Sequence, residues 1–267
     1  MFNLYRITDK IAAGKIPIGS HVGFDSPFLT EAIAGCGFDF IWIDAEHSAI
    51  DKKDIQNHLL ACRAAGVAGI VRVPWNDHVF IKSILDMGAD GIIVPMVRSL
   101  EEAKQVAAAT HYPPNGVRGM GTRRAVNYSL WDKAAYTANE DRYVWTIVQI
   151  EHVDVVKDLE AIAALPGISG FVIGPNDYAM SMNTQEKRYT AASPEARAEF
   201  DKIGEILRKT GKPFGVSGVY SEQFVQDWLK RGANWLCMNF DFNYVINGGK
   251  AVLKGTHQTL EEIGRAY

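Results

Sequence analysis

The sequence has few cysteines and no long apolar segment. Its three cysteines, Cys36, Cys62 and Cys237, are widely spaced and odd in number, so they cannot form a complete disulfide framework. A few widely spaced cysteines without a disulfide framework are typical of a protein in a reducing compartment. The polar, mixed stretch Met1–Lys10 does not resemble a signal peptide, and we therefore expect a cytoplasmic protein. No apolar run approaches the roughly 18 residues of a membrane span, so no membrane partner is expected.

An excess of charge of one sign is also missing. The chain has 28 basic and 31 acidic residues, a net charge of -3, and both signs are scattered along it. A nucleic-acid groove or a membrane-binding face needs clustered basic residues, so neither is expected. Almost half of the 267 residues are hydrophobic, enough for one large core, and we predict a single domain over residues 1–267.

Short apolar, β-branched segments alternate with amphipathic ones throughout the chain. Ser26 before Pro27 is typical of a helix start, and Gly66 is typical of a helix end. The predicted strands are Ile16–Val22, Phe38–Asp44, Ala68–Pro74, Gly91–Pro95, Tyr143–Ile150, Gly170–Gly174, Lys212–Gly218 and Asn234–Phe240. The main predicted helices that follow them are Pro27–Gly35, Asp51–Ala65, Asp77–Met87, Ser99–Thr110, Val153–Leu165, Pro194–Lys209, Glu222–Arg231 and a last one from about Phe242.

Eight strands, each followed by a helix, predict an α/β fold, the (β/α)₈ or TIM barrel. The near-continuous apolar strands favour a parallel sheet that is covered by helices. The rival architecture is a doubly wound open sheet, but no glycine-rich dinucleotide loop follows the first strand. The long irregular stretch His111–Leu130 is the main departure from the alternation, and such a stretch is usually functional or disordered.

Charged residues stand where the predicted strands end. In a barrel, the carboxyl ends of all strands meet at one mouth, where catalytic residues are found. Each residue also has a structural interpretation: an acid can cap the next helix, an arginine can form a buried salt bridge, and a histidine can be satisfied under a loop. The residues at these ends are Asp44, Glu46 and His47 after the second strand, Arg72 near the end of the third, Glu151 after the fifth and Asp177 after the sixth.

This set of residue types suits metal-assisted chemistry on an oxo acid. Two carboxylates fit a hard divalent cation, with Mg²⁺ preferred and Mn²⁺ or Co²⁺ as alternatives, and leave positions for a chelating 2-oxo acid. Arg72 would stabilise a developing enolate oxygen, and the imidazole of His47 suits a general base. A Schiff-base mechanism would need a pocket lysine, but no lysine follows a predicted strand, and Lys212 begins one at the opposite face.

Six segments in order resemble the class II pyruvate aldolases of the HpcH/HpaI type, over nearly the whole chain. They are GFDFIWIDAEH, VRVPWND, LDMGADGIIVPMV, HYPPNGVRGMG, VQIE and GFVIGPND. The resemblance implies a (β/α)₈ barrel and a divalent metal held by Glu151 and Asp177. It implies His47 as the base, oriented by Asp86, with Arg72 polarising the pyruvyl oxygen. It also implies that backbone around Gly174, Pro175 and Asn176 holds the pyruvate carboxylate, and that the chain forms a homo-oligomer, a hexamer or trimer of dimers.

The chain departs from the family pattern in places. Asn176 stands where the family often has alanine or serine, and it would either add a donor to the bound acid or cap the next helix. Arg123 and Arg124 lie in a segment that matches no subfamily, and they are weaker candidates for binding a distal carboxylate or phosphate of the substrate. The alternative for these two arginines is a solvated loop. Asp44 is likewise a weaker candidate for a site residue.

The expected function is a reversible aldol cleavage of a 4-hydroxy-2-oxo acid into pyruvate and an aldehyde. The alternatives are a lyase acting on a hydroxyacyl-CoA thioester and a non-catalytic oxo-acid binding protein. Only Arg118, Arg123 and Arg124 form anything like a basic cluster for a CoA nucleotide.

Overall fold

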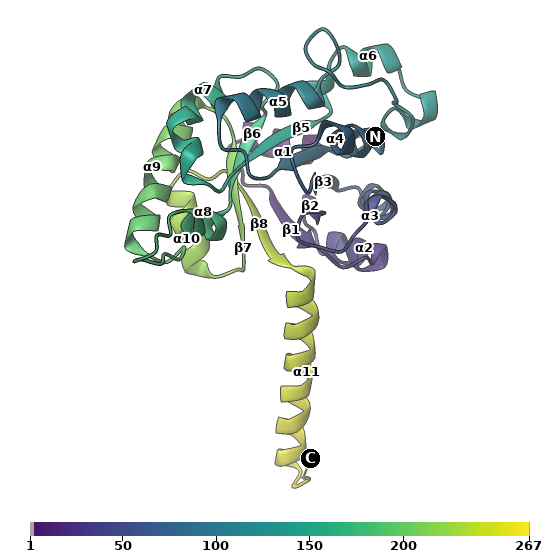
Figure 1. Cartoon of the computed structure of the whole chain (residues 1–267). Helices are drawn as coiled ribbons and strands as arrows, with labels where there is room; N and C mark the ends of the chain where they lie inside the picture. The colour runs from purple at the N-terminus through teal and green to yellow at the C-terminus, as the bar shows by residue number, and fades with distance from the viewer. Residues whose placement is uncertain (1–2, 267) are drawn as a thin grey trace.

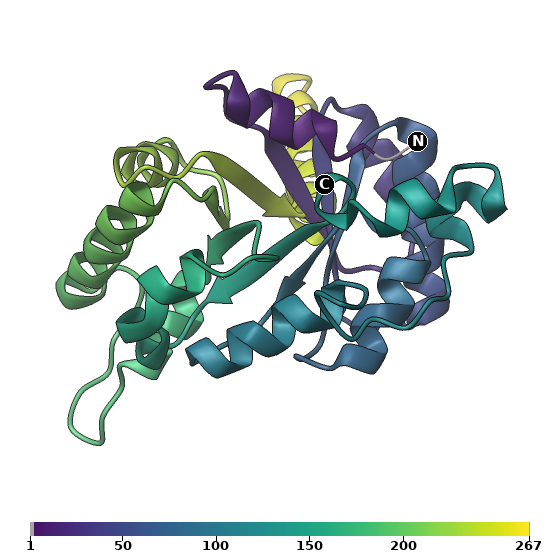
Figure 2. The ribbon, with the colours of Figure 1, turned by 90° about the horizontal axis from the view of Figure 1, so that it is seen from above.

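The computed structural model describes residues 3–266 and contains the predicted closed barrel. Eight parallel strands follow one another around it in sequence order, and β1 pairs with β8 to close the ring (Figures 1 and 2). The prediction of a (β/α)₈ barrel is therefore confirmed. The strands are β1 Ile18–Val22, β2 Phe40–Asp44, β3 Ala68–Arg72, β4 Gly91–Val94, β5 Trp145–Ile150, β6 Gly170–Ile173, β7 Phe214–Gly218 and β8 Trp235–Phe240.

Most predicted helices begin and end close to the observed ones, but the predicted helix Val153–Leu165 is a 3₁₀ turn, Val153–Asp158, followed by a short α-helix, Leu159–Ala163. Ser26 accepts a hydrogen bond from the Leu29 N–H and starts one helix, and Gly66 ends the next in the left-handed conformation, at φ 70°. The helices are α1 Tyr5–Ala12, α2 Pro27–Gly35, α3 Lys52–Ala65, α4 His78–Asp86, α5 Leu100–Thr110, α6 Lys133–Thr137, α7 Leu159–Ala163, α8 Pro175–Ser181, α9 Pro194–Thr210, α10 Glu222–Lys230 and α11 Asp241–Glu262, with short 3₁₀ turns η1 Arg124–Ser129, η2 Glu140–Arg142 and η3 Val153–Asp158.

Large apolar side chains fill the inside of the barrel. A β-carbon on Gly19 would lie 2.2 Å from the ring of Phe40, and one on Gly215 would lie 2.2 Å from the ring of Trp235. Each glycine thus makes room for an aromatic ring of a neighbouring strand. Helix α1, which the sequence analysis did not predict, adds buried Ile7 to this interior cluster, and the buried N-cap residue Leu4 joins it.

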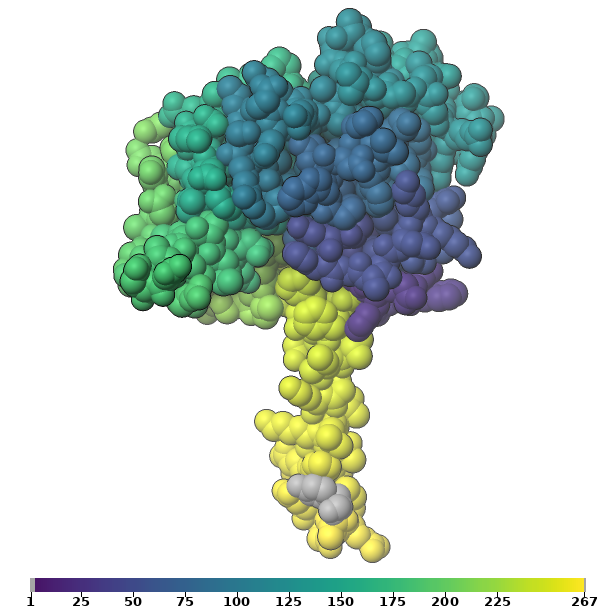
Figure 3. Space-filling model, viewed as in Figure 1, coloured from purple at the N-terminus to yellow at the C-terminus, as the bar shows by residue number. Residues whose placement is uncertain are grey.

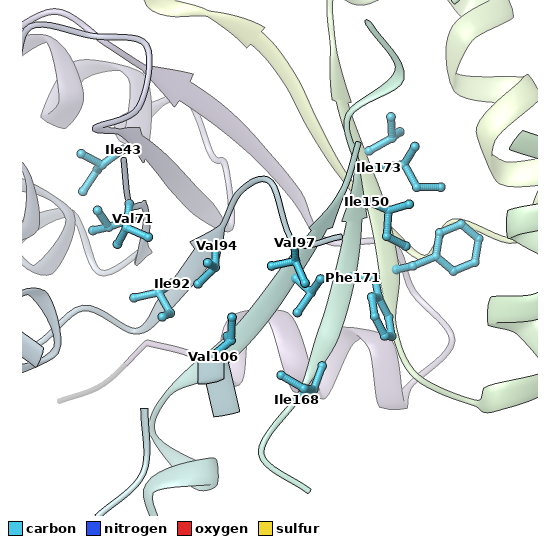
Figure 4. Packing of buried hydrophobic residues seen from close by; sticks show 14 of the residues in the cluster. Ile43, Val71, Ile92, Val94, Val97, Val106, Ile150, Ile168, Phe171 and Ile173 are labelled. Carbon is cyan, nitrogen blue, oxygen red and sulfur yellow. The ribbon is translucent and has the colours of Figure 1, made fainter. Parts of the chain in front are cut away.

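A second apolar layer joins the barrel to its outer helices. Alternate strand residues, such as Ile43 on β2 and Val71 on β3, point outward into this layer (Figure 4). They pack with helix residues such as Val106 of α5. The strand residues that alternate with these outward ones point into the barrel. The last inward residue of each strand therefore lies at the barrel mouth.

The segment between α5 and β5 lies at the amino-terminal end of the barrel. Helix α5 ends at Thr110 and β5 begins at Trp145, and both of these points belong to the face opposite the strand carboxyl ends. In Figure 1 this segment, with α6, lies on the side away from α11. Within residues 111–130, which the sequence predicts to be irregular, the only helical element is η1, and non-helical backbone at Val126, Asn127 and Tyr128 interrupts it; α6 and η2 come after this stretch.

Helix α11 leaves the carboxyl-terminal face of the barrel and projects away from it (Figures 1 and 3). Among its 22 residues, only Asp241 is buried in the single chain. No helix in the described part of the chain is long and apolar enough to cross a membrane.

Candidate active site

A cavity of about 570 Å³ opens at the carboxyl ends of the strands. Its walls come from the ends of β1, β2, β3, β5, β6, β7 and β8 and from the loops that follow several of them. The barrel thus brings together residues from distant parts of the sequence. Among those that the sequence analysis singled out, the cavity is lined by Asp44, His47, Arg72, Gly174, Pro175, Asn176 and Asp177.

Arg72 is held in the cavity wall by Asp44. Its Nε donates to Asp44 Oδ1 at 2.9 Å and its Nη2 donates to Oδ2 at 2.6 Å, which makes a planar two-bond pair. Burial by itself would raise the pKa of Asp44, but the hydrogen bonds and charge of Arg72 outweigh it, so the pKa lies below its usual value. Asp44 Oδ1 also accepts from the N–H groups of Glu46 and His47, so Asp44 shapes the loop that carries them.

Glu46 lies between Arg72 and His47. Its Oε2 is 3.0 Å from Arg72 Nη1 and 3.6 Å from His47 Nε2. This oxygen is buried and accepts no hydrogen bond from the described residues, so its contact with Arg72 is electrostatic. Burial raises the pKa of Glu46 to about 7, the charges of Asp44 and Asp177 add to the shift, and Arg72 opposes it. The sequence analysis noted Glu46 but gave it no role.

Glu151 is buried just beyond the end of β5. Its Oε1 accepts from the Met96 N–H at 2.5 Å, and its Oε2 accepts from the side-chain amide of Gln149. Burial raises the pKa of Glu151 to about 7, and the negative charges of Glu46 and Asp177 raise it further, against those two hydrogen bonds. The site therefore gathers more negative charge than Arg72 alone neutralises.

Asp177 is exposed in the first turn of α8, beside the end of β5. Gly174 is the N-cap of this helix and Pro175 follows it, so the alternative in which Asn176 caps the helix is not observed. A β-carbon on Gly174 would lie 3.1 Å from Glu151 Oε2, which shows how closely the start of α8 approaches that carboxylate. A side chain at this position would crowd the Glu151 carboxylate and the Gln149 amide.

The donor set of Glu151 and Asp177 fits a hard divalent cation. Both are carboxylates at the mouth of neighbouring strands, and a cation between them would offset the repulsion that raises the pKa of Glu151. Within residues 3–266, no group of three or more histidine, cysteine, aspartate and glutamate side chains is arranged to hold a metal. A site with two protein ligands is compatible with that observation, because Mg²⁺ keeps several positions for water and substrate.

Asp86 does not lie near His47 in the single chain. It ends α4 at the amino-terminal face of the barrel, where its Oδ1 accepts from Arg118 Nη2 at 3.1 Å. The side chain of His47 is 61% exposed at the opposite face, and the carboxylate nearest to it is that of Glu46. The implied orientation of His47 by Asp86 is therefore not formed within one copy of the chain.

Arg123 and Arg124 also lie at the amino-terminal face. Arg124 is buried, and its guanidinium donates to the carbonyls of Met87 and Leu59, which leaves it a structural role in the single chain. Arg123 is exposed at the start of η1. Neither residue reaches the cavity of its own chain, because the segment that carries them joins the barrel at the other end.

The sequence analysis missed Gln149 and His21, which both line the cavity. Gln149 stands two residues before Glu151, so the alternation of a strand places the two on the same side. His21 is a polar residue in the apolar segment of β1, at an inward position near the strand end. The same alternation applied to each strand would have identified both of them.

Comparison with known proteins agrees with this geometry. The family model described as HpcH/HpaI aldolase/citrate lyase matches residues 18–248. A 4-hydroxy-2-oxo-heptane-1,7-dioate aldolase of Klebsiella pneumoniae is 33% identical over 249 residues, and one of Escherichia coli is 31% identical over 243 residues; each comparison covers 91% of both chains. The crystal structure of an HpcH/HpaI aldolase from Desulfitobacterium hafniense, 24% identical, superposes with a TM-score of 0.84 over 94% of this chain and 96% of that one.

The family model covers most of the barrel, and each of the two relatives aligns over nine-tenths of its own length. The solved structure supports the fold independently. The predicted aldolase class is confirmed by these matches, and the chain belongs to the HpcH/HpaI aldolase/citrate lyase family.

Proposed function

We propose that the protein cleaves a 4-hydroxy-2-oxo acid reversibly into pyruvate and an aldehyde. The observation that carries this proposal is the pair of Arg72 and Asp44 at the cavity wall, close to the carboxylates of Glu46 and Glu151 and in the same cavity as Asp177. A fixed positive charge beside a cation site suits a reaction in which an enolate oxygen develops. The two relatives named as 4-hydroxy-2-oxo-heptane-1,7-dioate aldolases support the same substrate class.

Glu151 and Asp177 would hold the divalent metal, with Mg²⁺ as the first candidate and Mn²⁺ or Co²⁺ as alternatives. The metal would supply Lewis acidity to the carboxylate and keto oxygens of the oxo acid. The backbone N–H groups at the start of α8, around Asn176, would hold the substrate carboxylate. Gln149 fixes the Glu151 carboxylate through its amide, and its own carbonyl oxygen is buried without a hydrogen bond from any described residue.

The remaining steps follow from the positions of two side chains. The His47 imidazole accepts the proton of the C4 hydroxyl, and the O–H electron pair forms the carbonyl of the departing aldehyde. The C3–C4 bond breaks and its electron pair becomes the enolate of pyruvate. Arg72 stabilises the enolate oxygen, because Asp44 holds its guanidinium in one plane before the substrate arrives. Return of the proton to C3 gives pyruvate.

The active assembly is a homo-oligomer in this proposal. Helix α11 exposes Val252 (71%) and Leu253 (57%) in the single chain, and its Gly248 and Gly249 weaken an isolated helix by about 1 kcal/mol each. A second copy packed against α11 would bury these apolar side chains and would offset the loss of helix stability from the two glycines. Apolar residues are also exposed at the two ends of the barrel, among them Phe28 at one end and Leu130 at the other. Contact between unlike ends closes into a ring where the rotation between copies allows it, as the proposed trimer of dimers requires.

Such a contact would also bring Asp86 of one copy toward His47 of another. This is the arrangement in which the implied role of Asp86 is possible, because the two residues lie at opposite ends of one barrel. Glu46, 3.6 Å from His47 in the same chain, is the alternative orienting group.

The test is pyruvate formation from 4-hydroxy-2-oxoheptanedioate and shorter 4-hydroxy-2-oxo acids. The protein is first stripped by a chelator and then refilled with Mg²⁺, Mn²⁺ or Co²⁺. We expect activity to vanish on stripping and to return with metal, and the Glu151→Gln variant to stay inactive after refilling. Activity that survives stripping would contradict the roles of Glu151 and Asp177.

The other two functions give different results in the same experiment. A hydroxyacyl-CoA lyase would release a product only from the CoA thioester, and a non-catalytic binding protein would bind pyruvate without releasing an aldehyde. Absence of cleavage with every metal, for a protein that still binds pyruvate, would therefore contradict the aldolase proposal.

A further inference from the structure

His21 is a buried histidine in the cavity wall that the reaction above does not use. It lies on β1, is 3% exposed, and lines the same cavity as Arg72. Its ring contacts Trp42 and Phe240 edge-on, with centroid distances of 4.4 and 4.6 Å. These two aromatic rings hold the imidazole in place.

Neither ring nitrogen of His21 makes a hydrogen bond with the part of the chain that the structure describes. A neutral imidazole has one N–H donor and one acceptor nitrogen. The aromatic faces beside it can accept a weak contact from the N–H, but they offer nothing to the acceptor nitrogen. A buried polar group without a partner lowers stability, so its place in a cavity wall points to a partner on the ligand.

The surroundings of His21 keep it uncharged. Burial lowers its pKa to about 3, and the positive charge of Arg72 adds to the shift against the opposite effect of Asp44. His21 is therefore neutral near pH 7 and too weak a base to take a hydroxyl proton. A neutral imidazole can pair with a hydroxyl group through either nitrogen, because a hydroxyl group is both a donor and an acceptor.

The position of His21 indicates which part of the substrate it meets. The proposed metal ligands and the backbone that would hold the substrate carboxylate follow β5 and β6, whereas β1 lies between β2 and β8 on the other side of the ring. Arg72, at the proposed enolate oxygen, is on β3, between the two sides. Next to His21, the pairing of β1 with β8 is shifted, and Asn239 takes a left-handed backbone conformation at φ 60°. This irregularity sets the position of Phe240 against His21, and irregular strand positions of this kind often adjust side chains beside active sites.

We propose that His21 is a specificity-determining residue that hydrogen-bonds a hydroxyl group on the aldehyde-derived part of the substrate, beyond C4. The preferred acceptor is then a hydroxyaldehyde rather than an unsubstituted alkyl aldehyde. This inference rests on the proposed function, because it takes the metal and the substrate carboxylate to lie at the ends of β5 and β6.

Two aldehydes of nearly equal size test it in the direction of aldol formation. Glycolaldehyde and propanal have the same number of non-hydrogen atoms, and only glycolaldehyde carries a hydroxyl group. We expect the ratio of their kcat/KM values to fall roughly tenfold or more in His21→Phe, through loss of glycolaldehyde turnover, with propanal turnover unchanged. His21→Gln keeps a donor and an acceptor and should retain most of the preference. An unchanged ratio in His21→Phe would overturn the proposal.

A structural role for His21 gives a different result. The phenylalanine ring keeps the contacts with Trp42 and Phe240 and removes two buried polar atoms, so Tm at pH 7.5 should be no lower than that of the wild type. Exchange of the pyruvate methyl protons in D₂O, which reports the enolate half alone, should also be unchanged. A lower Tm together with slower exchange would show that His21 only supports the barrel.

Failure of the proposed function is separable from failure of this inference. A wild-type protein that neither exchanges pyruvate protons nor cleaves substrate with any metal contradicts the proposed function. In that case ¹⁵N spectra of the histidine rings decide about His21, with its signal identified by its loss in His21→Phe. A shift of that signal with glycolaldehyde but not with propanal supports the proposal, and equal spectra overturn it.

Discussion

Arg72 and Asp44 form a buried, two-bond ion pair across neighbouring strands, with N–O distances of 2.9 and 2.6 Å. The two residues face each other in the register of β2 and β3, so the pair is a direct result of that register. The guanidinium also lies 5.4 Å from the centre of the Trp42 ring. Asp44 thus fixes the direction of a positive charge that would otherwise be free to turn.

Removal of Asp44 should destabilise the protein strongly. Asp44→Ala leaves Arg72 buried without its two-bond partner, with Glu46 as the remaining ion-pair contact, and breaking a buried pair in this way typically lowers the free energy of unfolding by about 3 kcal/mol. Asp51→Ala, which removes the exposed cap of α3, is the matched control with an expected loss of about 1 kcal/mol. Urea unfolding of both variants measures the difference, and equal losses would contradict a stabilising role for the pair.

Replacement of Arg72 should affect the chemical step more than substrate binding. We expect Arg72→Ala to lower kcat by roughly 10²-fold or more, the order seen when one charge-stabilising group is removed. Arg72→Lys keeps the charge but loses the two-bond fork, so it should recover only part of the activity. Lys209→Ala, on the exposed face of α9, is the control. A kcat near that of the wild type in Arg72→Ala would rule out the role at the enolate oxygen.

The orientation of His47 can be assigned by mixing two inactive variants. If Asp86 acts on the His47 of another copy, mixed oligomers of His47→Ala and Asp86→Ala should recover up to about a quarter of the wild-type activity, because some contacts then combine both intact residues. No recovery, with Glu46→Gln as inactive as His47→Ala, would instead assign the orienting role to Glu46, 3.6 Å from His47 in the same chain.

His21 should make the protein less stable in acid. Its pKa is lowered from 6.5 to about 3, so between these values the unfolded chain binds a proton that the folded protein does not. Stability is therefore lost as pH falls below about 6.5, by about 2 kcal/mol at pH 5 relative to pH 8. His21→Phe should lack this component. Denaturant unfolding of both metal-free proteins at the two pH values checks it, and the same pH dependence in both would contradict it.

A charge on α11 should dissociate the oligomer. Leu253 is 57% exposed in the single chain, and we expect Leu253→Glu to separate the copies because an unpaired carboxylate is poorly tolerated in an apolar interface. Lys250→Glu changes the same exposed helix at a polar position and serves as the control. Light scattering after gel filtration gives the mass. An unchanged mass for Leu253→Glu would show that α11 does not hold the assembly together.

Local patterns predicted much of the barrel. The β-branched runs and the capping residues Ser26 and Gly66 identified the strands and most helices, because strand alternation and helix capping depend on nearby residues. The polar residues at the strand ends were found in the same way. Helix α1 was missed because it is short, mostly polar and has few apolar residues. The burial of these residues depends on contact with the side chains inside the barrel.

By itself, the sequence determined the (β/α)₈ barrel and the kinds of side chain at its mouth, because these follow from periodicity and from the position of each residue within its own strand. Only the tertiary structure decided which of them meet. Pairing of β2 with β3 placed Glu46 beside Arg72, and closure of the ring placed His21 across the cavity from Gly174. The antiparallel course of α4 carried Asp86 to the other face. Such relationships join residues far apart in the sequence, and no local pattern contains them.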